Sequence, residues 1–230
     1  MGDRNQQLLV SRYREALSGP FLEIGSKNYG NTQNLRELFP GESYVGADMS
    51  PGENVDCVVD FTADFQRVDA MLGHRRFGTI FCFSVLEHCE QPFVMAANMT
   101  RLLQPGGKIV LSVPFAWKFH GYPSDYWRFT HEGIRKLFPA IDWDTVDAGL
   151  WHTPGISRFH RVDESLGKLR LSAGHQLSRN GLRAGLGMGI LKLLRPLGLF
   201  SELLANRYLL VPTMVDMIGV LKPDGTEPPS

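Results

Sequence analysis

The sequence predicts an α/β protein built on a doubly wound, mostly parallel sheet of seven strands. Short apolar runs of strand length alternate along the chain with segments of helical periodicity, which is the pattern of a parallel sheet covered by helices. Of the 230 residues, 43% are hydrophobic, enough to bury the core of one large domain or two small ones. Carboxylates and glycines follow several of these runs, so we expect a ligand site beyond the carboxyl ends of the strands.

The predicted elements follow one another without an internal repeat. Residues 3–18 form an amphipathic helix that Pro20 ends. Strands are then expected at 21–25, 44–47, 56–59, 77–83 and 108–113. Helices are expected at 31–39, 65–72 and 91–103.

The C-terminal part adds a helix, two more strands and a long insertion. Thr130 is the expected N-cap of a helix through Phe138. Strands are predicted at 141–148 and 208–221, and residues 150–206 between them are expected to be mostly helical. The arrangement is that of a Rossmann-like fold with a helical insertion near the C-terminus.

The charge of the chain is balanced overall but uneven along the sequence. Its 24 Lys and Arg residues equal its 24 Asp and Glu residues, which gives no electrostatic case for a nucleic-acid partner. Residues 151–210 nevertheless hold nine basic and three acidic side chains. A segment of this charge would raise the local concentration of an anionic ligand.

The cysteines and the apolar tracts favour a reducing compartment. Three cysteines, Cys57, Cys82 and Cys89, do not make a disulfide framework, and their spacing suits no zinc site. The N-terminus lacks the apolar core of a signal peptide, and the longest apolar tract, 186–204, is interrupted by charges. We therefore expect a cytoplasmic protein without a transmembrane segment.

The ends of the first four strands carry the residues expected at the ligand site. Gly25 and Gly30 follow the first strand and would let the backbone approach a ligand closely. Asp48 ends the second strand about 20 residues after Gly25, where one carboxylate can accept hydrogen bonds from both hydroxyls of a ribose. Asp60 ends the third strand and Ser84 follows the fourth. Taken singly, each could equally be a turn glycine or a strand-end cap.

Together these motifs resemble class I S-adenosylmethionine-dependent methyltransferases, in particular the methyltransferase type 11 group. The resemblance covers residues 20–115 and the last strand, and it is carried by Glu23-Ile24-Gly25, by residues 77–88 and by residues 101–114, which include Pro105-Gly106-Gly107. The competing interpretation, a nicotinamide-dependent dehydrogenase, requires G-x-G-x-x-G after the first strand, and residues 25–30 lack it.

The resemblance implies S-adenosylmethionine as the cofactor and assigns its binding residues. These are the residues at the strand ends and next to them: Glu23, Gly25, Ser26, Gly30, Asp48, Met49, Asp60, Phe61 and Ser84. Asp48 would hold the ribose hydroxyls and Asp60 would lie near the adenine amino group. Glu23 and Gly25 would lie near the methionine portion, and Ser84 near the sulfonium. The chain departs from the family motif at residues 26–29, where Lys27 stands beside a cationic cofactor.

Residues 115–130, after the fifth strand, are expected to face the methyl donor. They are dense in aromatic side chains, which exclude water and pack an acceptor. Asp125, His120 and His88 are candidate catalytic residues, since a hydroxyl acceptor benefits from a base. Alternatively, Asp125 pairs with Arg128 to fix the loop, and His88 has only a structural role. The sequence shows no cluster of metal ligands.

The function implied by the resemblance is methyl transfer to the oxygen of a small molecule or glycoside, in a biosynthetic pathway. An anionic or sugar-containing acceptor fits the basic segment and the aromatic loop. Transfer to nitrogen and a non-catalytic S-adenosylmethionine-binding partner subunit are the alternatives. We expect a single domain, 1–230, in which 1–18 is the N-terminal helix, 20–150 the cofactor-binding core, 151–206 a helical lid and 208–221 the last strand. The lid segment could instead form a homodimer contact or touch a membrane surface.

Overall fold

The chain folds into two compact units, each with its own sheet. The computed structural model describes residues 3–30, 34–121, 123–144, 149–153, 155, 157–162, 168–170, 181–197, 208–210 and 213–223. One unit comprises Met1–Arg161 with Pro212–Ser230, and the other comprises Val162–Val211.

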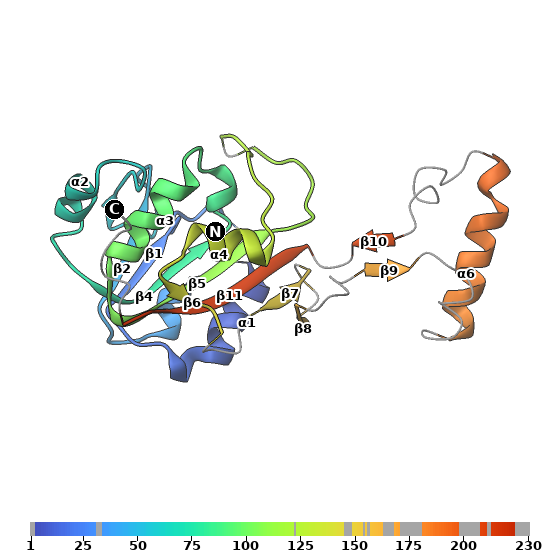
Figure 1. Ribbon diagram of the computed structural model, residues 1–230, viewed down its shortest axis with the longest axis horizontal. Coiled ribbons are helices and arrows are strands. Elements are labelled where there is room, and N and C mark those ends of the chain that lie inside the picture. The colour runs from blue at the N-terminus through green and yellow to red at the C-terminus, as the bar shows by residue number, and fades with distance from the viewer. Residues whose placement is uncertain are drawn as a thin grey trace. The chain divides into compact units, whose positions relative to one another are not determined.

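The first unit is built on a nine-stranded sheet with the strand order β3-β2-β1-β4-β5-β11-β7-β8, in which β6 also pairs with β11 (Figure 1). Strands β3, β2, β1, β4 and β5 are parallel, and the pairs from β5 onward are antiparallel. The strands are β1 (Phe21–Ile24), β2 (Tyr44–Asp48), β3 (Cys57–Val58), β4 (Phe77–Phe83), β5 (Leu103–Pro114), β6 (Ile141–Asp142), β7 (Leu150–His152), β8 (Phe159–Arg161) and β11 (Met214–Leu221).

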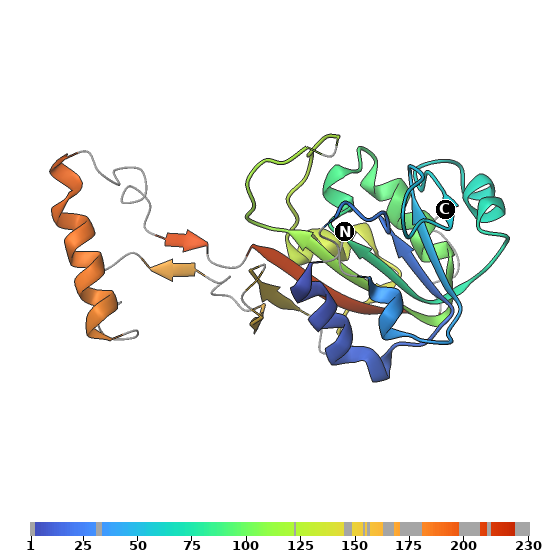
Figure 2. The same ribbon diagram turned by 180° about the vertical axis from the view of Figure 1, so that it is seen from behind.

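Helices cover both faces of this sheet. Helices α3 and α4 lie on one face, and α1 with η2 lies on the other, as the opposite views of Figure 1 and Figure 2 show. Asp3 caps α1 in a reciprocal capping box with Gln6, and Pro92 opens α3 at the position where proline suits a helix. The helical segments are α1 (Arg4–Tyr13), η1 (Arg14–Ala16), η2 (Leu35–Leu38), α2 (Phe65–Met71), η3 (Leu86–His88), α3 (Pro92–Arg101) and α4 (His131–Leu137).

The core lies where the central strands meet the two helical layers. All seven residues of β4 are buried, as expected for a strand with helices on both faces. Under α1 and η2, Phe21 and Phe81 stack at 5.8 Å between ring centroids and pack with Leu9, Leu35 and Phe83. This rigid centre fixes the carboxyl ends of β1 and β4, where the site is found.

The second unit contains a two-stranded antiparallel sheet of β9 (Lys168–Arg170) and β10 (Tyr208–Leu210). Its helical segments are α6 (Leu182–Leu193) and η4 (Arg195–Leu197). Across the described residues of both units, no helix combines the length and the apolar character needed to cross a membrane.

The predicted fold class is confirmed, with corrections in the C-terminal part. The described part of residues 150–206 holds strands that were not predicted, since β7 pairs with β11, β8 pairs with β7 and β9 pairs with β10, beside the helical segments α6 and η4. The predicted strand at 208–221 is two elements, β10 and β11, in different sheets. These added strands make the main sheet larger than the seven strands predicted. A lid role for residues 151–206 stays a prediction.

Two predicted elements are shorter than expected. The helix predicted at 31–39 is the 3-10 turn η2, because Asn34 caps Arg36 directly, while residues 31–33 lie outside the described residues. The strand predicted at 141–148 is limited to β6, and residues 145–148 lie outside the described part of the chain.

Candidate functional site

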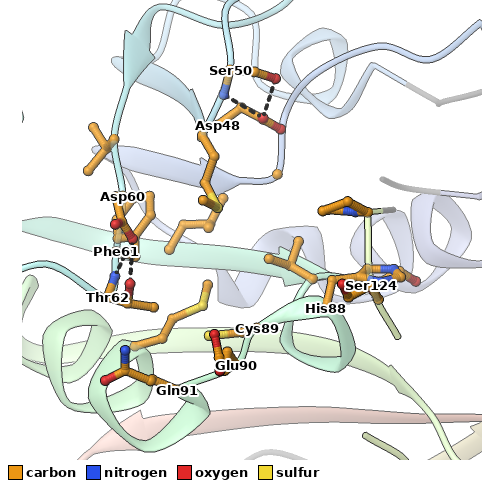
Figure 3. Close-up of a pocket in the computed structure, with 18 of the residues that line it drawn as sticks. Asp48, Ser50, Asp60, Phe61, Thr62, His88, Cys89, Glu90, Gln91 and Ser124 are labelled. Carbon is orange, nitrogen blue, oxygen red and sulfur yellow. Dashed lines mark hydrogen bonds between the residues drawn. The ribbon is translucent and has the colours of Figure 1, made fainter. Parts of the chain in front are cut away.

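A cavity of about 460 Å³ lies at the carboxyl ends of the parallel strands. The chain runs from β1 to β2 on one side and reaches β4 on the other, so the strand order reverses beside β1. This reversal is where an open α/β sheet holds its ligand. Residues that follow β1, β2, β3 and β4 line the cavity, together with the start of α3 and part of the segment after β5. Figure 3 shows Asp48 and Asp60 approaching from one side, and His88 and Ser124 from another.

Asp48 stands at the end of β2 and lines the cavity. Its Oδ1 accepts hydrogen bonds from the Ser50 backbone N–H at 3.0 Å and from Ser50 Oγ at 3.3 Å (Figure 3). Lys27, the residue that departs from the family motif, donates from Nζ to Ser50 Oγ at 3.0 Å. The turn therefore fixes Oδ1, while no hydrogen bond to Oδ2 is found among the described residues.

Asp60 repeats this arrangement after β3. Its Oδ1 accepts from the Thr62 backbone N–H at 2.8 Å and from Thr62 Oγ1 at 2.6 Å (Figure 3). Phe61 between them is buried and lines the cavity, and the Asn98 side chain of α3 donates to the Phe61 carbonyl at 2.8 Å. Met49, after β2, also lines the cavity and is 74% exposed. Two apolar side chains beside two carboxylates suit a flat heteroaromatic ring joined to a polyol.

The residues predicted around the first strand divide into two groups. Gly25 lines the cavity with φ at 79°, a conformation that favours glycine. Glu23, Ser26 and Gly30 do not line the cavity. Glu23 is buried and accepts from the Tyr44 hydroxyl at 2.7 Å, and burial raises the pKa of its carboxyl.

Ser84 turns the chain at the end of β4 and lines the cavity. Its φ of 52° is unusual for a residue other than glycine, and such backbone strain is often found at functional sites. Gln6 of α1 donates from Nε2 to Ser84 Oγ at 3.3 Å. The N-terminal helix therefore supports the cavity, a role that the sequence did not predict.

The segment after β5 docks on the turn η3. His88 lines the cavity, and its Nδ1 lies 2.6 Å from the Ser124 carbonyl oxygen. The backbone N–H of Tyr126 donates to the Glu87 carbonyl at 2.8 Å, and Trp127 Nε1 donates to the Cys89 carbonyl at 2.8 Å. These bonds hold Ser124 and Tyr126 against the cavity.

Asp125 and His120 lie beside the cavity and do not line it. The Asp125 side chain is fully buried, accepts from Arg128 Nη2 at 2.7 Å and accepts from the His120 backbone N–H at 2.8 Å. Hydrogen bonding to Arg128 holds the pKa of the Asp125 carboxyl well below its usual range. The ion pair weighed as the alternative to catalysis is therefore present, and a catalytic role for Asp125 or His120 stays a prediction.

Folding brings together three side chains that the sequence did not connect. Ligand atoms of Glu87, His88 and His120 all lie within 4.8 Å of one another. The rings of the two histidines meet edge to face at 4.9 Å between centroids. Glu87 is 1% exposed, and burial raises the pKa of its carboxyl to about 7. His120 reaches this cluster only through the docking of the segment after β5, which no spacing in the sequence reveals.

Several lining residues were missed although the sequence holds a signal for two of them. Ser50 and Thr62 each stand two residues after a strand-end aspartate, and this Asp-x-Ser/Thr pattern favours a turn in which the aspartate accepts from the backbone. Other missed residues follow from tertiary packing and include Tyr29, Val59, Cys89, Glu90, Gln91 and Met95, whereas Pro123, Ser124 and Tyr126 belong to the segment 115–130 that was predicted to face the methyl donor.

Known proteins similar to this chain share its fold. A malonyl-[acyl-carrier protein] O-methyltransferase from Alcanivorax borkumensis is 26% identical over 144 residues, which are 59% of this chain and 49% of that protein. The chain thus spans about half the length of this curated relative. A methyltransferase structure from Archaeoglobus fulgidus, titled as S-adenosylmethionine-dependent, matches with a TM-score of 0.53 at 13% identity and covers 93% of this chain and 92% of its own.

A second solved structure agrees on the fold. It is titled "Conversion of a Disulfide Bond into a Thioacetal Group during Echinomycin Biosynthesis" and matches with a TM-score of 0.51 at 11% identity, over 97% of this chain and 84% of its own. The protein family described as "Methyltransferase domain" matches residues 3–150, which contain the parallel half of the sheet and every residue that lines the cavity. The chain therefore belongs to the class I S-adenosylmethionine-dependent methyltransferase family.

Proposed function

We propose that this protein transfers a methyl group from S-adenosylmethionine to an oxygen of a small-molecule acceptor. One observation carries the proposal. The cavity beside β1, where the strand order reverses, has the carboxylates of Asp48 and Asp60, each held by a turn, at one end and the docked segment after β5 at the other. Such a cavity can hold a nucleoside and an acceptor end to end.

The cofactor pose follows from the polar groups of the cavity. Asp48 Oδ2 accepts from the ribose hydroxyls, because Ser50 occupies Oδ1. Met49 and Phe61 would hold the adenine ring, and Asp60 would accept from its amino group. Gly25 would make room for the methionine portion, and Ser84 would lie nearest the sulfonium.

The acceptor enters beside His88, Ser124 and Tyr126. These three residues form what we call the acceptor wall. His88 Nδ1 is directed to Ser124, and its Nε2 is buried toward Glu87, so His88 acts by holding this wall in place. In the reaction a C–O bond forms as the C–S bond breaks, the hydroxyl proton passes to water, and S-adenosylhomocysteine leaves. Alignment and exclusion of water then supply most of the rate enhancement.

Oxygen is favoured over nitrogen by the curated relative, which is named for O-methyl transfer. The direct experiment incubates the protein with methyl-labelled S-adenosylmethionine and a panel of hydroxylated, carboxylated, phosphorylated and amine acceptors, followed by mass spectrometry. Methyl ethers or esters are expected. Methylamines alone would move the assignment to nitrogen. Binding of the cofactor with no labelled product from any acceptor would favour a non-catalytic partner subunit.

A further inference from the structure

A buried cluster of three side chains lies behind the acceptor wall. Glu87 of η3 is 1% exposed, and neither of its carboxylate oxygens has a hydrogen-bond partner among the described residues. His88 Nε2 is equally buried, also lacks a hydrogen bond within the described chain, and lies 3.9 Å from Glu87 Oε1. Buried polar atoms are rarely left without a partner, and a buried carboxylate costs most. Glu87 and His88 therefore offer three buried polar atoms to a partner.

Each histidine of the cluster has a carbonyl or carboxylate oxygen next to its Nδ1. His88 Nδ1 lies 2.6 Å from the Ser124 carbonyl oxygen, so Nδ1–H donates there and Nε2 carries the lone pair. His120 Nδ1 lies 3.2 Å from the Lys118 carbonyl oxygen and 3.2 Å from Asp125 Oδ2. A carbonyl or carboxylate that receives the second ring N–H fixes the tautomer and directs the other nitrogen to a metal ion.

The neighbouring charges leave the cluster suited to a cation. The charged side chains that act on Glu87 are those of Arg128 and Asp125. The Arg128 guanidinium donates through Nη1 and Nη2 to the carboxylate of Asp125. Asp125 thus neutralises Arg128, and the Glu87 carboxylate remains to balance an added positive charge.

We propose that Glu87, His88 and His120 bind a divalent transition-metal ion, with zinc as the best match. Two imidazoles and one carboxylate form a known three-ligand zinc set that keeps one position open. Zinc–ligand bonds of about 2.0–2.2 Å require the three atoms to draw closer together than they lie now. The His120 side chain, which is 25% exposed, has room for that movement.

The ion would link two elements that already contact each other beside the cavity. Glu87 and His88 belong to η3, whereas His120 belongs to the segment after β5. A shared ion would fix that segment next to the cavity that His88 lines. The open position would hold water or, if the proposed methyl transfer is correct, an oxygen of the acceptor.

Titration with Co²⁺ tests the site, because its visible absorption reports the coordination. Chelator-treated full-length protein is titrated with Co²⁺ and then with Zn²⁺ as competitor, and metal content is measured after dialysis. We expect one equivalent of Co²⁺, four-coordinate bands and displacement by Zn²⁺. His120→Ala and the isosteric Glu87→Gln should lose stoichiometric binding. His74→Ala, at an exposed histidine paired with Asp69, is the matched control and should bind as the wild type does.

Binding of S-adenosylhomocysteine, measured on the same samples, separates the two proposals. Circular dichroism checks that each variant is folded. Asp125→Asn should weaken Co²⁺ binding by about 10-fold, because the Asp125 carboxylate no longer orients the His120 ring. No stoichiometric Co²⁺ or Zn²⁺ in a wild-type protein that binds S-adenosylhomocysteine would overturn the metal site alone. Undiminished Co²⁺ binding by folded His120→Ala would also overturn it.

Discussion

Asp48→Asn isolates the contribution of one carboxylate to cofactor binding. The asparagine keeps Oδ1, which accepts from Ser50, and replaces Oδ2, the oxygen proposed to bind the ribose, by an NH₂ group. The turn is therefore preserved, while the charged acceptor for the ribose hydroxyls is removed. A hydrogen bond to a charged group contributes about 1.5–3 kcal/mol. A loss of about 2 kcal/mol corresponds to a dissociation constant for S-adenosylhomocysteine roughly 30-fold higher.

Isothermal titration calorimetry with S-adenosylhomocysteine measures this change. Asp144→Asn is the matched control, because Asp144 is an exposed carboxylate paired with Arg135 and does not line the cavity. It should bind as the wild type does. A dissociation constant for Asp48→Asn within twofold of the wild-type value would refute the assignment of Asp48 to the ribose.

Three further predictions concern the acceptor wall and the core. Asp125→Asn should lower the methyl-transfer rate more than the affinity for S-adenosylhomocysteine, because it loosens the wall and leaves the cofactor end intact; equal losses would contradict this. Gly78→Ala should lower the free energy of unfolding, measured in urea, by about 1–3 kcal/mol, because the added Cβ would lie 2.5 Å from two backbone carbonyl oxygens. Gly187→Ala is the control and should not cause this loss, because its Cβ would meet nothing within 4 Å. Burial alone would lower the pKa of His152, but a hydrogen bond to Asp216 and the nearby carboxylate of Asp3, 3.9 Å away, raise it from 6.5 to about 9. The urea midpoint should therefore fall as pH rises from about 6.5 to 9, and Asp216→Asn should flatten that dependence.

The parallel half of the fold could be predicted because its signals are local. The mostly apolar run of β4 marks a strand, and the Pro105-Gly106-Gly107 motif marks the change from helix to strand, both without reference to distant residues. The antiparallel half could not be predicted in the same way. Strands β7 and β8 have three residues each; β7 is held by pairing with β11, which comes late in the chain, and β8 pairs with β7. Such short strands have too little periodicity of their own to be recognised.

The residues of the candidate site likewise fall into those marked by local sequence signals and those placed by tertiary packing. Asp48, Asp60 and Ser84 follow strands whose ends could be located, so their position at the cavity was predictable. Gln6 and His120 reach the site from the N-terminal helix and from the segment after β5, and their contacts depend on tertiary packing. The His152–Asp216 pair, buried between β7 and β11, depends on the strand pairing that the sequence concealed.

A crystal structure of the protein with S-adenosylhomocysteine would examine the cofactor site atom by atom. We expect the ribose hydroxyls on Asp48 Oδ2, the adenine ring between Met49 and Phe61, and the sulfur directed toward Ser124 and Tyr126. The ligand bound outside the cavity, or inside it with the ribose turned away from Asp48, would contradict the proposed site.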